Sequence, residues 1–77
     1  MKINIELMGA LVDYLPASEK GQSVLTLNDE STIADLLNHL KIKRRVSVAV
    51  NGDEEKGLEH VLSDGDDVLI FTVISGG

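Results

Sequence analysis

The chain has 77 residues, a formal net charge of −6 and 43% hydrophobic residues, which indicates one small globular domain whose single core supplies only about 3–5 kcal/mol of net stability. It contains no cysteine, which excludes disulfides, thiolate metal sites and a cysteine nucleophile. Its acidity argues against nucleic-acid binding, because such binding depends on Lys and Arg neutralising phosphates.

The first predicted element is a strand over residues 2–8. Ile3, Ile5 and Leu7 alternate with polar residues, which is the pattern of a sheet with one buried face. This start lacks the continuous apolar core of a signal peptide, and no run of residues reaches transmembrane length. We therefore expect a cytoplasmic protein without membrane contact.

A long connection, Gly9–Gln22, is predicted next. Its apolar residues are scattered, and Leu11–Leu15 are expected to form a helical turn. A second strand is predicted over Ser23–Leu27 and ends at the polar residues 28–30.

The clearest predicted element is a short amphipathic helix. Thr32 and Asp35 have the spacing of a capping box, in which each side chain bonds the other residue's backbone N–H. Behind them one apolar stripe has helical spacing and comprises Ile33, Leu36, Leu37 and Leu40. The stripe predicts a helix lying on a sheet. His39 is outside it, without a partner at ligand spacing, so we expect no metal site there.

A basic cluster follows the predicted helix and comprises Lys41, Lys43, Arg44 and Arg45. Cations at this place complement the negative end of a helix dipole, which is our interpretation of the cluster. The acidic balance of the whole chain could in addition steer it toward a basic surface on a partner protein.

A third strand is predicted over Val46–Val50, where valines alternate with small residues, and Asn51-Gly52 is a strong turn signal. The polar run 53–57 lacks the ligand spacing of an EF-hand, so we interpret it as a solvated loop and not as a calcium site.

A small apolar patch of Leu58, Val61 and Leu62 is expected to form a turn of helix that closes one end of the core. A tight turn is predicted over Ser63–Asp67, with Gly65 free to adopt positive φ. Two of its aspartates are one residue apart, but no adjacent histidine or phosphate loop accompanies them, so we do not expect acid/base catalysis there.

The last predicted strand, Val68–Ile74, is apolar on both faces apart from Thr72, which indicates a central strand. The order strand, strand, helix, strand, strand places the first and last strands parallel at the sheet centre. We therefore predict an α+β fold of the β-grasp type: a mixed sheet of four to five strands with one main helix packed across one face. Residues 1–77 would form one domain with a flexible C-terminal Gly-Gly tail.

At this point the sequence resembles the MoaD/ThiS family of ubiquitin-like sulfur carriers for molybdopterin and thiamine synthesis. The similarity covers nearly the whole chain. The segments that carry it are Leu11–Pro16, Thr32–Leu37, Val50–Gly52, Leu62–Val68 and the terminal Ser75-Gly76-Gly77.

The resemblance implies that Gly77 is the reacting group. A ubiquitin-activating-like enzyme would join its carboxylate to AMP from ATP, and a sulfur donor would then displace AMP to leave a thiocarboxylate. Gly76 would give clearance in a narrow channel, and Ser75, Ile74 and Phe71 would contact the partner. The chain would be a co-substrate and not an enzyme, and it would bind neither cofactor nor metal itself.

Two features bear on the pathway. Thr72 and Val73 follow Phe71 where molybdopterin-type carriers often have two prolines, whereas Gly9–Gln22 is longer than the tight hairpin of thiamine-type carriers. We predict the molybdopterin pathway, with the synthase large subunit as the sulfur acceptor. The alternatives are a thiamine-type carrier that serves a thiazole synthase and a ubiquitin-like protein modifier.

Overall fold

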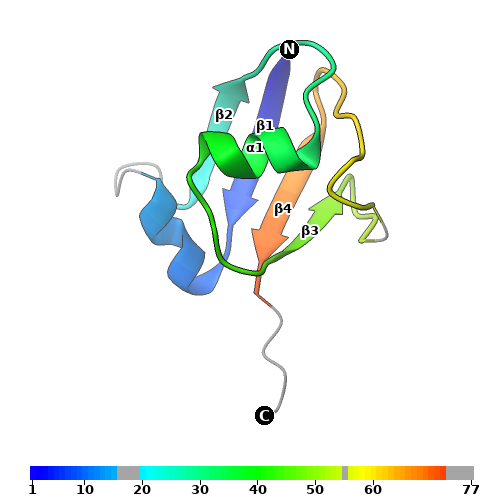
Figure 1. Ribbon diagram of the computed structural model, residues 1–77. Helices are drawn as coiled ribbons and strands as arrows, with labels where there is room; N and C mark the ends of the chain where they lie inside the picture. The colour runs from blue at the N-terminus through cyan, green and yellow to red at the C-terminus, as the bar shows by residue number, and fades with distance from the viewer. Residues whose placement is uncertain (16–19, 55, 73–77) are drawn as a thin grey trace.

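The computed structural model describes residues 1–15, 20–54 and 56–72. Its elements are β1 (Lys2–Leu7), the 3₁₀ helix η1 (Gly9–Tyr14), β2 (Gln22–Thr26), α1 (Ile33–His39), β3 (Ser47–Val50) and β4 (Asp67–Phe71). The strands form a four-stranded sheet in the order β2-β1-β4-β3, and α1 crosses one face of it (Figure 1). This arrangement confirms the predicted α+β fold.

The sheet is mixed, with a parallel pair at its centre. β1 runs antiparallel to β2 and parallel to β4, and β3 runs antiparallel to β4. A parallel pair cannot be joined by a tight hairpin, and here the chain between β1 and β4 includes the helix that covers the sheet. The prediction that the first and last strands lie together at the centre is confirmed.

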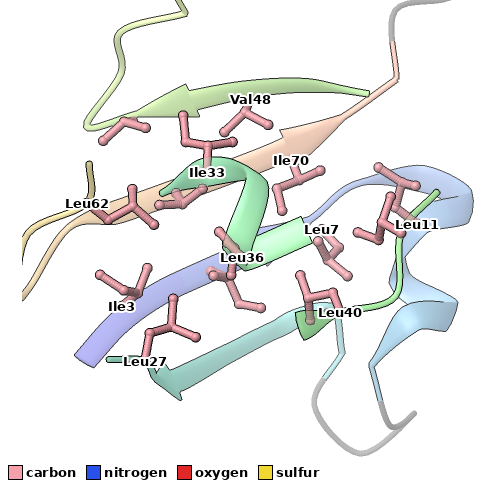
Figure 2. Packing of buried hydrophobic residues seen from close by; sticks show 14 of the residues in the cluster. Ile3, Leu7, Leu11, Leu27, Ile33, Leu36, Leu40, Val48, Leu62 and Ile70 are labelled. Carbon is pink, nitrogen blue, oxygen red and sulfur yellow. The ribbon is translucent and has the colours of Figure 1, made fainter. Parts of the chain in front are cut away.

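The core lies between α1 and the sheet (Figure 2). The side chains of Ile3 in β1, Leu36 in α1 and Ile70 in β4 are 0% exposed, and so is Leu11 of η1. No polar or charged side chain is buried within the described ranges. Burial of apolar surface between these elements is therefore the main stabilising contribution.

The predicted capping box is present at the start of α1. The Asp35 N–H donates to Thr32 Oγ1 at 3.2 Å, and the Thr32 N–H donates to Asp35 Oδ2 at 2.9 Å. Ile33 and Leu36 are buried on the sheet, whereas Leu37 at the edge of the stripe is only half-buried. Local sequence thus determines both where the helix begins and which side faces the core.

The helical turn predicted over residues 58–62 is wrong. These residues form no helix, and Leu58 and Val61 are 56% and 49% exposed, so only Leu62 reaches the core. The reason is that the backbone of this segment accepts hydrogen bonds from the first N–H groups of α1. Carbonyl oxygens of Leu58 and His60 accept the N–H groups of Ala34 at 3.0 Å and Ile33 at 3.1 Å, donors that have no partner within their own helix.

The predicted turns are confirmed. Asn51 and Gly52 have φ values of 52° and 85°, and Gly65 has a φ of 86°, which is the left-handed region that such residues tolerate best. The helical turn expected over Leu11–Leu15 is present as η1, displaced toward the N-terminus.

Candidate functional site

The end of β4 is the candidate site because this strand leads to the terminal glycines. β4 is paired on both sides: Ile5 and Leu7 of β1 lie opposite Val68 and Ile70, and Val48 of β3 lies opposite Ile70. Beyond the ladder, the Met8 N–H donates to the Ile70 carbonyl at 3.0 Å. The strand is thus fixed close to the point where it ends.

The start of β4 is held by the aspartates of the preceding turn. The Lys2 N–H donates to Asp64 Oδ1 at 2.6 Å, and Asn51 Nδ2 donates to Asp66 Oδ1 at 3.0 Å. The Asp67 N–H in turn donates to Asn51 Oδ1 at 2.9 Å. These carboxylates are acceptors for the backbone and for an amide, which accounts for them without any acid/base chemistry.

Phe71 lies on the sheet face opposite α1. Along β4 the side chains alternate: Val68 and Ile70 are buried toward the helix, whereas Leu69 and Phe71 are half-buried on the other face. Phe71 is paired with Ser47 of β3 and is not a member of the core cluster. Its ring is therefore placed where a partner could contact it.

The face opposite α1 has a shallow hollow that sequence reasoning missed. Its lining includes the polar Asn4 and Glu6 of β1 together with the apolar Val24, Ala49 and Leu69. Val24 is 57% exposed. The available signal was the alternation of β2 and β4, which places Val24 and Leu69 on the polar side of the sheet.

A second hollow lies at the end of β4. It is lined by Arg44, Arg45, Val46, Ser47 and Thr72. Thr72 follows β4 and is the last described residue. The other predicted site residues, Ile74, Ser75, Gly76 and Gly77, lie outside the described residues. The strand predicted to run to Ile74 is wrong at Thr72, because β4 ends at Phe71 and Thr72 is no longer part of it.

The described part of the chain was predicted to hold no metal site. It holds no group of three or more His, Asp or Glu residues that could ligate a metal ion. His39 is exposed on α1, and His60 is half-buried in the segment that caps this helix. No helix among the described residues is long and apolar enough to cross a membrane.

The sheet order and the position of α1 define a ubiquitin-like β-grasp protein. The solution structure of the HVO 2177 protein of Haloferax volcanii matches with a TM-score of 0.80 at 22% identity, covering 100% of this chain and 87% of that one. The crystal structure of SAMP1 from Haloferax volcanii matches with a TM-score of 0.75 at 17% identity, covering 100% of both chains. These likenesses show the fold.

A third solved structure is a complex of subunits 1 and 2 of molybdopterin-converting factor from Helicobacter pylori. One chain of that complex matches with a TM-score of 0.64 at 17% identity, and the match covers 100% of this chain and 100% of that one. A search of curated proteins found no significant match. The model of the ThiS family matches residues 5–77, terminal glycines included. The chain belongs to the ThiS family, which confirms the resemblance seen in the sequence.

Proposed function

We propose that the chain is a sulfur carrier whose C-terminal Gly77 is adenylated and converted to a thiocarboxylate. The carboxylate oxygen of Gly77 would attack the α-phosphorus of ATP and release pyrophosphate, and a sulfur donor would then displace AMP from the acyl carbon. The observation that carries this proposal is the ThiS-family match, which extends from residue 5 through Gly77.

The described residues support a role for the body in positioning the C-terminal tail. Paired on both sides, β4 would hold the tail at a fixed place on the body. Phe71, half-buried and outside the core cluster, would supply an apolar contact to the activating enzyme or to the sulfur acceptor, with Ile74, Ser75 and Gly76 following into the channel. The chain itself would be a co-substrate, and the activating enzyme would use the ATP.

We further propose molybdopterin biosynthesis as the pathway. The shared fold with the Helicobacter pylori molybdopterin-converting factor complex supports this choice, and the synthase large subunit would be the sulfur acceptor. Native co-purification from the host separates the pathways: recovery of a molybdopterin-synthase large subunit supports the proposal, whereas recovery of a thiazole synthase assigns the carrier to thiamine synthesis.

A second candidate is a ubiquitin-like modifier, in which the same carboxylate forms isopeptide bonds with lysines. It is favoured by the likeness to a Haloferax volcanii protein named small archaeal modifier protein 1, with a TM-score of 0.76 at 15% identity, covering 95% of this chain and 98% of that one. Denaturing blots of host extract distinguish the two functions. Covalent ladders survive denaturation and would support the modifier, whereas a single band at the mass of the free chain supports the carrier.

Deleting Gly77 tests the proposed reacting group directly. The truncated chain should show no ATP–pyrophosphate exchange with the host's activating enzyme while its circular dichroism spectrum and thermal transition stay unchanged. The exposed Gly57, twenty residues before Gly77 in the sequence, gives the control, because Gly57→Ala removes no proposed function. Exchange by the truncated chain at the wild-type rate would show that the reacting group lies elsewhere.

A further inference from the structure

The charges of this acidic chain are strongly segregated. Residues 36–52 contain no Asp or Glu and four of the seven Lys and Arg residues, namely Lys41, Lys43, Arg44 and Arg45. The remaining 60 residues hold the other three cations and all 13 carboxylates. The segment therefore carries +4 and the rest of the chain −10, which gives the net charge of −6.

These four cations, here named the basic loop, lie at the functional end of the molecule. The connection from α1 to β3 passes the end of β4 (Figure 1). Ser47, which follows the loop, is paired with Phe71, and Arg44 and Arg45 line the same hollow as Thr72. The 3₁₀ helix η1, which carries the exposed Asp13, contacts both β1 and β4 at this end of the sheet.

The part of the basic loop that contains Lys43, Arg44 and Arg45 is anchored on both sides. Ile42 is 5% exposed, and its N–H donates to the Leu37 carbonyl at 2.9 Å. Val46 packs against the core cluster. Between these anchors Lys43, Arg44 and Arg45 are exposed, and none of them forms an ion pair with any residue in the described ranges. The fold thus holds these cations at a fixed place without an ion pair to any described residue.

The helix dipole does not account for the arginines. α1 ends at His39, and the dipole effect falls off within the last turn of a helix. Lys41 is close enough to complement it, but Arg44 and Arg45 lie beyond that range and beside β4. Our sequence-based interpretation of the cluster as a dipole complement therefore does not extend to the two arginines.

We propose that the basic loop docks against a carboxylate-rich surface of the activating enzyme, next to the channel that receives the tail. This inference rests on the proposed function. An acidic partner surface would attract the +4 loop and repel the −10 remainder of the chain, so it would orient the end of β4 toward itself during encounter. A nucleic acid is disfavoured as the occupant because the same −10 charge repels phosphates.

The test is the steady-state KM for the carrier in ATP–pyrophosphate exchange by the activating enzyme of the same host. The variant Arg44→Gln/Arg45→Gln should raise this KM about tenfold at low salt and leave kcat unchanged, because mutating charges at the edge of an interface mainly slows association. The matched control Lys2→Gln/Lys56→Gln removes the same charge from two exposed residues outside the basic loop, and it should change KM less than about twofold.

Two further measurements separate charge from shape. The difference between the arginine variant and the wild type should largely vanish at about 0.5 M NaCl, where screening acts within a few ångströms. The variant Arg44→Lys/Arg45→Lys retains both charges and should restore most of the wild-type KM. Circular dichroism establishes that each variant is folded.

The outcomes are distinguishable. Equal KM values for the arginine variant and its control, at low salt and with the wild type active, would overturn the proposed docking of the basic loop. The sulfur-carrier proposal would be unaffected. No exchange by the wild type would overturn the proposed function and the proposed docking together. Binding of the wild-type chain to a short DNA duplex more tightly than to the enzyme would overturn the proposed docking in favour of a nucleic-acid site.

Discussion

Gly21 shows at the scale of one residue why this small fold tolerates little change at a junction. It has a φ of 79°, and an added Cβ would lie 2.8 Å from Val12 Cγ1 and 2.9 Å from the Leu7 carbonyl oxygen. The Gly21 carbonyl also accepts the Leu7 N–H at 2.7 Å. A side chain at this position therefore meets both a backbone atom and an unfavourable backbone conformation.

We predict that Gly21→Ala lowers the free energy of unfolding by at least about 2 kcal/mol, because the clash adds to the cost of positive φ. Gly52 has a φ of 85° but open space around it, so Gly52→Ala should lower the free energy of unfolding by only about 1 kcal/mol. Gly57→Ala, which has open space and no positive φ, should be nearly neutral. Urea denaturation gives the three values. Equal losses for Gly21→Ala and Gly52→Ala would show that the contact with Leu7 is unimportant.

The helix cap gives a second test at residue scale. Thr32→Ala removes the hydroxyl that accepts the Asp35 N–H, and should destabilise the domain by about 1 kcal/mol. Asn38→Ala changes an exposed residue in the same helix and should be neutral or slightly stabilising, because Ala is the better helix former. Urea midpoints measure both, and a neutral Thr32→Ala would mean that the cap contributes nothing.

At the scale of elements, α1 is held on the sheet by its apolar stripe, and the segment 58–62 is held by backbone hydrogen bonds to α1. We expect Leu36→Ala to cost about 2–5 kcal/mol, because this side chain is 0% exposed. A loss of that size approaches the whole stability of a domain this small. Leu58→Ala, at 56% exposure, should cost little. Thermal unfolding measures both, and a large loss at Leu58 would restore the rejected view that it belongs to the core.

The elements that the sequence predicted well are those determined by local periodicity and caps. The stripe of α1, the alternation of β1 and the Asn51-Gly52 turn can each be recognised from neighbouring residues. The prediction of a helical turn over residues 58–62 was wrong because the conformation of this segment is set by long-range hydrogen bonds to Ile33 and Ala34. Periodicity counts apolar residues but does not register which backbone donors elsewhere need acceptors.

The site was predictable in part for the same reason. The apolar run of the last strand and the two glycines after it indicate the candidate site. The central position of the strand follows from the order of elements. That Phe71 lies outside the core follows only once β4 is known to turn Val68 and Ile70 toward α1. The proximity of Arg44 and Arg45 to Thr72 depends on the β3–β4 pairing, which residue spacing alone does not give.

At the scale of the whole molecule, the described residues form one body, and β4 ends at one side of it. The body buries one apolar core and offers no metal cluster among its described residues. At one end of it, β4, Phe71 and the basic loop lie together. Within the proposed function this arrangement has a physical purpose: the partner can recognise the body while the tail reaches into the channel.

The most direct test of the sulfur-carrier proposal is the intact mass of the chain purified from its host under sulfur-replete conditions, with the activating enzyme present. We predict a second species that is heavier by the difference between one sulfur and one oxygen atom, located on Gly77 by fragmentation and absent from the chain that lacks Gly77. Carboxylate alone, with no heavier species, would contradict the proposal that this protein carries sulfur.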